Sequence, residues 1–396
     1  MKIIKIVWLS PYNIFKLLPE VAINRKTGAH SSSWIHSLSE MLAQNKELEL
    51  HIITHTQLVN QTQHFKKNEI YFHIIKYNFP FTNKGFPWFF PLDKLTGYYS
   101  FSKRAKKLID EIHPDLLHVH GTEGGYFTPA FKTNIPCIIS IQGIISEITK
   151  LEPSIGGYLQ LPYEQKAIKN GKYFGCRTNF DFAYIKKKNI NAVIFDLPEA
   201  MNMVFYEHQW QPESGLSLLF IGSVIKRKGI EDLIAAVYKL KPIFPHIKLR
   251  IIGSGPKKYI QYLNKEIEKN NLRSHISFLG TKSQCEVAAE LARCNFFVLP
   301  SFIENSPNSL VEAMAVGVPS IATKVGGIPS MIEDKCDGML FEKNNVDELV
   351  NIIQILVNDK NLQNELSINA QKKAYQKNYP PHVAQKYFDV YKSLIQ

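Results

Sequence analysis

The sequence predicts an α/β protein of two domains, each built on a parallel sheet. Short apolar runs of strand character alternate with segments of helical periodicity along the chain, an alternation typical of parallel sheets. The 396 residues exceed one ordinary hydrophobic core and suit two domains of roughly 200 residues each. A polar stretch with proline and glycine, EHQWQPESGL at 207–216, separates the two halves. We therefore expect domains at 1–206 and 207–379.

The expected elements follow in order along the chain. In the first domain, strand-like runs fall at 3–9, 50–54, 116–120 and 137–141. A helix is expected at 32–45, because Trp34, Leu38 and Leu42 share one face at helical spacing. In the second domain, strand-like runs fall at 217–221, 248–252, 276–279, 296–299 and 319–322, with a helix at 230–240. The last segment, 380–396, predicts an amphipathic helix.

The apolar runs, cysteines and charge of the chain bear on where in the cell the protein is expected to act. No apolar run approaches the roughly 18–20 residues needed to cross a bilayer, and the opening stretch breaks at Ser10-Pro11, which favours a buried strand over a signal peptide. Five cysteines without CxxC spacing predict free thiols in a reducing cytoplasm. Residues 1–200 carry 24 Lys and Arg against 16 Asp and Glu. This balance suits an anionic membrane surface or reflects composition alone. No recognised module favours nucleic acid.

The most informative segment is 297–332, where Glu304 and Glu312 stand eight positions apart in a strand, a loop and a helix at 307–316. Pro307 suits a first helical position and Ser306 suits the cap. The amides of Asn308, Ser309 and Leu310 would then be open donors at the positive end of a helix dipole, a seat for phosphate. Carboxylates on both sides of that seat suit a ligand with hydroxyls on both sides of its phosphates, as in a nucleotide sugar. Solvated glutamates are the alternative.

This pattern resembles the Glu-x7-Glu motif of the family 4 glycosyltransferases, which are retaining enzymes of the GT-B fold. The resemblance covers most of the chain and is denser in the second half. It implies two facing Rossmann-like domains with a cleft between them, and a terminal helix at 380–396 that crosses back to brace the first domain. It also implies that Glu304 contacts the transferred sugar, that Glu312 contacts the ribose, and that no cofactor beyond the sugar nucleotide is needed.

The resemblance assigns further donor-binding residues in the second domain. The family carries an arginine and a lysine in the loop that corresponds to 222–229, and these side chains grip the diphosphate. Lys228 matches the lysine, although an exposed lysine at a helix start is the alternative. Ser223 stands at the arginine position, so half of that clamp is replaced by a hydroxyl. Gly253 and Gly280 match turns that border the nucleobase, and a purely structural turn is an equal alternative for each. The incomplete dinucleotide fingerprint argues against NAD.

In the first domain the resemblance points to three positions. Gly28 matches one glycine of a loop that touches donor phosphate and sugar. Gln142 stands where the family frequently has a histidine that contacts the transferred sugar, and glutamine can donate a hydrogen bond but cannot shuttle protons at neutral pH. His120, at the end of a buried strand, is either a contact to acceptor or sugar or a structural histidine.

No Asp-x-Asp and no metal-ligand cluster occurs in the sequence. The positive charge that meets the leaving diphosphate is therefore expected from Lys228 and the helix end. Residues 77–107 combine aromatic residues and prolines, and Lys103, Arg104, Lys106 and Lys107 follow in that run. This segment predicts an insertion at a lipid interface or on a lipid-linked acceptor, or else a packed surface loop.

The expected function is a retaining, metal-independent glycosyltransferase that moves a sugar from a nucleotide-diphosphate sugar to a hydroxyl of a glycan or lipid-linked acceptor. The expected setting is bacterial surface polysaccharide biosynthesis, such as lipopolysaccharide or capsule. The protein would be cytoplasmic, or peripheral at the inner face of the cytoplasmic membrane. The alternatives are a non-catalytic paralogue that binds sugar nucleotide, because Ser223 and Gln142 depart from the family, and a GT-B-type epimerase or phosphorylase.

Overall fold

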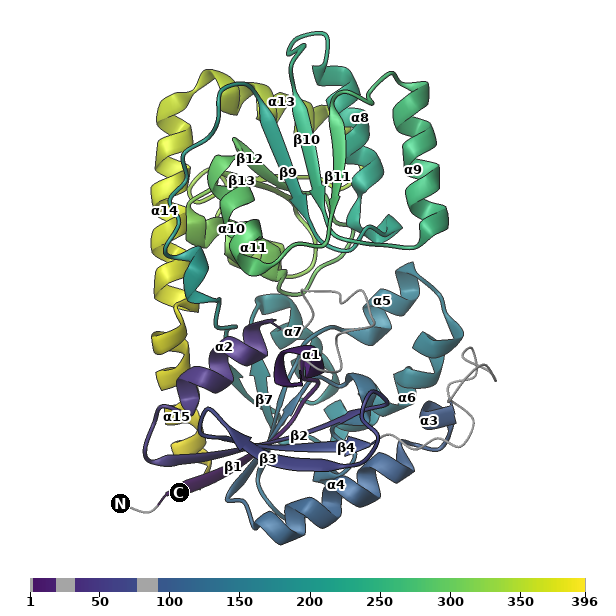
Figure 1. The fold of residues 1–396 in the computed structure, drawn as a ribbon, viewed down its shortest axis with the longest axis vertical. Helices are drawn as coiled ribbons and strands as arrows, with labels where there is room; N and C mark the ends of the chain where they lie inside the picture. The colour runs from purple at the N-terminus through teal and green to yellow at the C-terminus, as the bar shows by residue number, and fades with distance from the viewer. Residues whose placement is uncertain (1–2, 19–32, 77–91, 396) are drawn as a thin grey trace. The chain divides into compact units, whose positions relative to one another are not determined.

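The computed structural model describes residues 3–18, 33–76 and 92–395 of the chain (Figure 1). These residues form two compact units. Unit 1 comprises the described residues up to Ala200 together with the C-terminal segment from Pro380, and unit 2 comprises Met201–Tyr379. No helix of the described residues has the length and apolar character that a bilayer span requires.

Unit 1 is built on an eight-stranded sheet with the order β3-β4-β2-β1-β5-β6-β7-β8. All neighbouring strands are parallel except the β3/β4 hairpin. The apolar run of β1 is buried from Ile6 to Leu9, as expected for a central strand covered on both faces. The strands are β1 (Ile4–Leu9), β2 (Leu48–Thr56), β3 (Gln63–Lys67), β4 (Ile70–Lys76), β5 (Leu116–His120), β6 (Cys137–Ser140), β7 (Tyr173–Cys176) and β8 (Val193–Asp196).

Helices cover both faces of this sheet. One face, which carries Val7 and Leu9, packs on α4 (Tyr99–Ile112), α6 (Ile155–Asn170) and α7 (Asn179–Lys188). Side chains alternate between faces along a strand, so Trp8 points to the opposite face. There its indole nitrogen donates to the hydroxyl of Tyr391 at 3.0 Å, on α15 (Pro380–Ile395), which packs against α2 (Ser33–Leu42). The remaining helices of unit 1 are α1 (Ile14–Leu17), α3 (Leu92–Leu95) and α5 (Ile145–Leu151).

Unit 2 is built on a fully parallel six-stranded sheet with the order β11-β10-β9-β12-β13-β14. Among its helices, α8 packs against α13, and α11 packs against both α10 and α14. The strands are β9 (Ser217–Ile221), β10 (Lys248–Ile252), β11 (Ile276–Gly280), β12 (Phe296–Leu299), β13 (Ser320–Thr323) and β14 (Met339–Phe341). The helices are α8 (Ile230–Leu240), α9 (Lys257–Lys269), α10 (Gln284–Arg293), α11 (Asn308–Val316), α12 (Ile328–Met331), α13 (Val346–Asn358) and α14 (Lys360–Asn378).

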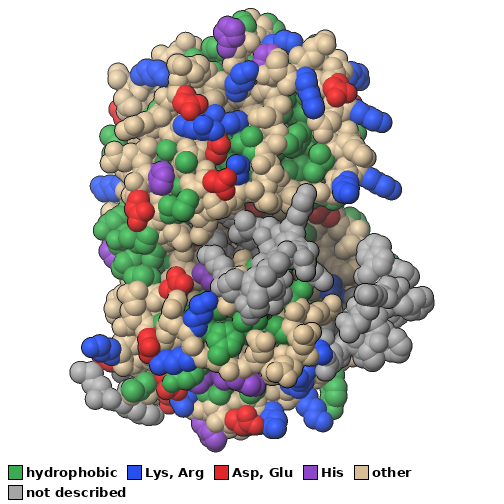
Figure 2. Space-filling view, viewed as in Figure 1, with side chains coloured by type: hydrophobic (Ala, Val, Ile, Leu, Met, Phe, Trp, Pro, Cys, Tyr) green, Lys and Arg blue, Asp and Glu red, His purple; other side chains and the backbone are tan. Residues whose placement is uncertain are grey.

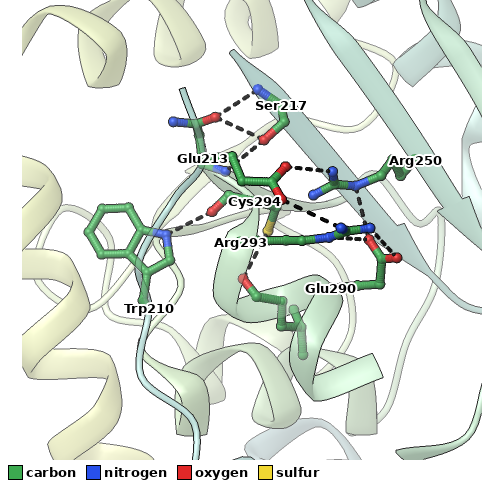
Figure 3. Close-up of polar contacts among 9 residues, drawn as sticks. Trp210, Glu213, Ser217, Arg250, Glu290, Arg293 and Cys294 are labelled. Carbon is green, nitrogen blue, oxygen red and sulfur yellow. Dashed lines mark hydrogen bonds and ion pairs between the residues drawn. The ribbon is translucent and has the colours of Figure 1, made fainter. Parts of the chain in front are cut away.

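The segment that was expected to separate the domains is held firmly by unit 2. Figure 3 shows Glu213 beside Arg250 of β10 and Arg293 of α10, with both arginines also paired to Glu290. The indole nitrogen of Trp210 donates to the carbonyl of Cys294 at 2.8 Å. The short 3-10 turn η4 (Met203–Phe205) likewise packs on α10 and α11. The change of unit therefore falls after Ala200, earlier than the boundary expected between 206 and 207.

Candidate active site

The loops that follow the strands of unit 2 gather at the carboxyl edge of the sheet because all its strands are parallel. Strands β9 and β12 are neighbours, so the loop at 222–229 lies beside the loop at 300–307. Their backbones are joined directly, since the amide of Phe302 donates to the carbonyl of Arg227 at 2.8 Å. This joint brings Lys228 and Glu304, from distant parts of the sequence, to one place.

Lys228 and Glu304 form an ion pair through the lysine ammonium and Oε1 of the carboxylate. The hydroxyl of Ser301 donates to the same oxygen at 2.7 Å, and the hydroxyl of Thr323 donates to the carbonyl of Ser301 at 2.5 Å. The side chains of the pair are only 13% and 9% exposed. An ion pair so little hydrated is strongly coupled, and loss of either partner leaves a charge that is costly to bury.

Glu304 is also fixed through its backbone. The amide of Gly327 donates to the carbonyl of Glu304 at 3.0 Å. Gly326 has a φ of +53°, and a Cβ atom there would lie 1.9 Å from the same carbonyl oxygen. Only glycine allows both this left-handed conformation and this close approach. The Gly326-Gly327 pair thus positions Glu304.

The start of α11 differs from the sequence-based expectation. Pro307 is the N-cap residue, with extended backbone and no side-chain cap, so Ser306 does not cap the helix. The amide of Leu310 donates to the carbonyl of Pro307 at 3.1 Å, which removes it from the three expected open donors. Among the described residues, the amides of Asn308 and Ser309 keep no acceptor, and Oδ1 of Asn308 is buried without a hydrogen-bond partner. Two amides therefore remain for an anion at this helix end.

The other donor-binding candidates of unit 2 lie on the same edge or beneath it. Glu312 is on α11 and 1% exposed, whereas Ser223 is exposed on the loop after β9. The amide of Gly253 donates to the carbonyl of Gly280 at 2.8 Å, so the two turns are joined. A Cβ atom at Gly253 would lie 1.8 Å from the carbonyl oxygen of Gly222, which gives this glycine a structural reason of its own.

In unit 1, His120 is the last residue of β5 and is in register with Ser140 of the neighbouring β6, which Gln142 follows. His120 is 1% exposed and packs between Trp8 and His118, with ring centroids at 4.3 and 3.9 Å. Within the part of the chain that the structure describes, neither of its ring nitrogens has a hydrogen-bond partner. Burial, with His118 and Arg177 nearby, holds the pKa of His120 well below its usual value, so the ring is neutral.

Sequence reasoning missed three charged residues at this edge of unit 1. Glu123 follows β5 and accepts the amide of Gly143 at 3.0 Å, and burial raises the pKa of its carboxyl. Arg177 follows β7 and pairs with Glu199 at 2.5 Å, both nearly fully buried. Burial raises the pKa of Glu199, and Arg177 opposes that rise. Their positions directly after strands were the available signal, but β7 itself was not predicted. Gly28 lies outside the described residues.

Two doubly wound units, one with a cation and free helix amides at its sheet edge, are typical of α/β proteins that bind phosphorylated ligands. Residues 208–373 match the family described as Glycosyl transferases group 1, and residues 27–174 match Glycosyl transferase 4-like. An uncharacterized glycosyltransferase of Methanocaldococcus jannaschii is 31% identical over 82% of this chain and 84% of that protein. The chain therefore belongs to the group 1 glycosyl transferases.

Solved structures agree on the fold. Sucrose-phosphate synthase from Thermosynechococcus elongatus superposes with a TM-score of 0.81 at 17% identity, covering 99% of both chains. Anabaena HepE in complex with UDP-glucose gives 0.72 at 15% identity, covering 98% of this chain and 99% of that one. The protein has the GT-B fold, as predicted.

Proposed function

We propose that this glycosyltransferase retains the anomeric configuration of the sugar and takes it from a nucleotide-diphosphate sugar. The observation that carries the proposal is the Lys228–Glu304 ion pair, which lies on the same sheet edge as the two amides of Asn308 and Ser309 that have no acceptor among the described residues. A cation beside free helix amides suits a diphosphate, and a carboxylate next to that cation suits sugar hydroxyls. The binding of UDP-glucose by HepE, a protein of the same fold, supports a uridine nucleotide as the first donor to test.

Donor binding would redistribute the charge of this pair. The diphosphate would compete with Glu304 for the ammonium of Lys228. Once the ammonium contacts the diphosphate, the carboxylate of Glu304 is available to the hydroxyls of the transferred ring. Ser301 continues to donate to Glu304, which keeps the carboxylate oriented. The same pair of residues would thus place a cation, Lys228, on the leaving group and an anion, Glu304, near the positive anomeric carbon.

The chemical step balances without a dedicated protein base. The bond between the anomeric carbon and the donor phosphate oxygen breaks, and a bond to the acceptor hydroxyl oxygen forms on the same face of the ring. The hydroxyl proton passes to a phosphate oxygen of the leaving diphosphate. Lys228 and the amides of Asn308 and Ser309 stabilise the charge that grows there, an electrostatic contribution in a preorganised site. In this scheme the protein supplies that positive charge itself, so no metal ion is needed.

Residues of unit 1 are proposed to contact sugar or acceptor. Neither buried ring nitrogen of His120 has a hydrogen-bond partner among the described residues. This favours a polar ligand over a purely structural role, because buried polar groups are normally hydrogen-bonded. Gln142 follows the neighbouring strand and can donate to a hydroxyl. The proposed acceptor is a glycan or lipid-linked hydroxyl in surface polysaccharide assembly at the cytoplasmic side of a membrane, supported by the family and by the basic first half of the chain.

The proposal is tested with purified protein and a panel of sugar nucleotides, first by thermal shift. A ligand at 100 times its dissociation constant stabilises by about 2.7 kcal/mol. The donor so found is then assayed for transfer, and the anomeric configuration of the product is read by NMR. Retention is expected, and inversion would contradict the scheme. Tight binding without transfer or donor hydrolysis would favour the non-catalytic paralogue, which the departures at Ser223 and Gln142 keep open.

A further inference from the structure

Three of the four cations that the sequence offered for lipid contact already have partners within unit 1, and the fourth, Lys103, is exposed on α4. Arg104 donates to the carbonyl of Lys76 at 2.5 Å and to the hydroxyl of Thr62 at 2.6 Å. On the same helix α4, Lys106 pairs with Asp110 at 2.6 Å and Lys107 with Glu111 at 3.6 Å. Each of these cations already has a partner four residues along the helix or on the neighbouring strand and loop. A surface for an anionic partner therefore has to be sought elsewhere.

A groove of about 490 Å³ lies between α5, α6 and α7 of unit 1. Residues at helical spacing line it from each side, so it is formed by regular elements. Its polar wall contains Lys150 from α5, Tyr158 and Gln165 from α6, and Tyr184, Lys187 and Lys188 from α7. The floor is rigid, because Glu164 accepts the first amides of α5 at 2.6 and 3.2 Å and the hydroxyl of Tyr184 at 2.9 Å.

The charge of this groove is positive. Three ammonium groups line it against one carboxylate, that of Glu147, which is paired with Lys150 at 2.6 Å. Lys188 lies over the ring of Tyr184 at 4.9 Å from its centroid. Among the described residues, neither Lys187 nor Lys188 has a carboxylate partner, in contrast to the paired lysines of α4.

Between the groove residues Lys150 and Tyr158, the turn from α5 to α6 exposes large apolar side chains, and this turn is called the rim below. Leu151 ends α5, Ile155 begins α6, and Tyr158 follows one turn later. Their exposed fractions are 46%, 73% and 57%. Tyr158 lines the groove together with Lys187 and Lys188. Apolar side chains beside such lysines form an amphipathic surface of the kind that lies in a lipid interface, with ammonium groups at headgroup level and apolar side chains below it.

We propose that the groove between α5, α6 and α7, together with its rim, docks the protein on a membrane surface containing anionic phospholipid. Headgroup phosphates would contact Lys187 and Lys188, and the Leu151–Tyr158 corner would enter the interface. The inference deepens the proposed function, on which it rests for the idea that the acceptor is lipid-linked. It moves the membrane contact from α4 and the segment before it to a surface formed by described helices.

The test is co-sedimentation of the full chain with vesicles of phosphatidylcholine, and with vesicles of equal parts phosphatidylcholine and phosphatidylglycerol. Binding is expected only with phosphatidylglycerol and should weaken as salt rises. Lys187→Gln with Lys188→Gln should lower the vesicle affinity about 30-fold, at about fivefold per lysine near an anionic surface. The matched control, Lys106→Gln with Lys107→Gln on α4, should change it less than twofold. Equal loss in both double variants would overturn the assignment.

Two other occupants of this surface, a second copy of the chain and a soluble anion, would give different results. Ile155→Ser should reduce vesicle binding and leave the protein monomeric by sedimentation velocity. If instead the wild type is a dimer without lipid and Ile155→Ser separates it, the rim is an interface between copies and the proposal fails. Displacement from vesicles by glycerol phosphate at the headgroup concentration would indicate a site for a soluble anion. Thermal unfolding of each variant shows that it folds. Donor hydrolysis without vesicles is assayed separately, so failure of the proposed function is distinguishable from failure of docking.

Discussion

Lys228 and Glu304 form an ion pair on the carboxyl edge of the unit 2 sheet, and the hydroxyl of Ser301 donates to the same carboxylate oxygen at 2.7 Å. The two residues were expected to serve different parts of the donor, one the diphosphate and the other the sugar. Their contact means that neither acts alone, because removal of one leaves the other poorly hydrated and without its counter-charge. The site should therefore respond to substitutions as one coupled unit.

This coupling predicts strong non-additivity. Lys228→Ala should lower kcat by about 10²–10³, the usual cost of losing one electrostatic donor to a developing oxyanion. Glu304→Gln should lower kcat as well, and the double variant should be much less impaired than the product of the two effects. Steady-state kinetics on all four proteins measures the cycle. Additive effects would show that the two residues act independently in the reacting complex.

The two glutamates should differ in kinetic phenotype. Glu312 is proposed to accept hydrogen bonds from the ribose, which does not react, so Glu312→Gln should mainly raise the donor KM, about tenfold for a loss of roughly 1.4 kcal/mol. Glu304→Gln should mainly lower kcat, because its contacts act on the ring as positive charge develops. Donor saturation curves for both variants decide the matter. A reversed pattern would place the donor the other way round in the site.

A substitution at Gly326 tests the positioning of Glu304 without changing any polar side chain. Gly326→Ala should lower kcat because the new methyl group would meet the carbonyl oxygen of Glu304, at 1.9 Å before any relaxation. Gly215→Ala is the matched control, since Gly215 also has a left-handed φ, +89°, but nothing lies within 4 Å of its Cβ position. Both variants should lose stability, on the order of 1–2 kcal/mol from the left-handed conformation. Only Gly326→Ala should lose turnover, and equal kcat values would remove the positioning role.

Most of the fold could be predicted because its strands are buried on both faces and read as continuous apolar runs. One missed strand, β4, does carry a largely buried apolar run, IYFHIIK, and was overlooked. The other strands that were missed give a weaker signal. β3 is an edge strand with the sequence QHFKK, and β8 is exposed or half-exposed throughout. β7 and β14 are only four and three residues long. The boundary was misplaced because the polar segment at 207–216 looks like a linker in sequence, whereas its Glu213 and Trp210 are held by α10 and the chain next to it.

Only part of the candidate site could be predicted, because sequence motifs locate residues on single elements but do not show which elements lie side by side. Motif spacing located Lys228, Glu304 and the start of α11, because each lies directly after a recognisable strand or at a helix start. It could not show that Lys228 contacts Glu304, since this depends on the pairing of β9 with β12. The capping of α11 was wrong because the turn closes through Pro307 and Leu310, a local backbone choice that residue types alone do not determine. Arg177 and Glu199 pair across 22 positions, and their places after strands could not be used because β7 and β8 were not predicted.

The charge scheme predicts that transfer does not require a divalent metal ion. EDTA should leave the initial rate intact, because Lys228 and the helix amides supply the positive charge at the leaving diphosphate. The measurement is product formation at saturating donor, with and without chelator, followed by addition of Mg²⁺. Modest stimulation by Mg²⁺ is compatible with screening of the free donor. Strict dependence on added metal would refute the scheme.

A chain of histidines in unit 1 predicts how stability depends on pH. Figure 2 shows histidine side chains gathered on the face that carries β3 and β4. Nε2 of His51 lies 2.9 Å from Glu49, Nδ1 of His51 lies 3.0 Å from Nε2 of His73, and Nδ1 of His73 lies 2.9 Å from Nδ1 of His64. With one proton on each ring, every one of these contacts can be a hydrogen bond. A further proton on His73 would convert its one acceptor nitrogen, Nδ1, into a donor, and His64 would then have to change tautomer to keep the contact.

Burial and the neighbouring His51 and His64 lower the pKa of His73 from 6.5 to about 4. Above pH 6.5 both the folded and the unfolded chain have this ring neutral, so its contribution to stability is complete. Between pH 6.5 and about 4 the unfolded chain binds a proton that folded His73 does not, and the free energy of unfolding falls, by an amount on the order of 2 kcal/mol. Urea unfolding at pH 7.5 and pH 5 should show this loss in the wild type. His73→Gln should remove part of it, whereas His246→Gln at an exposed site of unit 2 should not. The same pH dependence in all three proteins would assign the acid sensitivity to other groups, of which buried His118, with its pKa lowered to about 3, is the first to test.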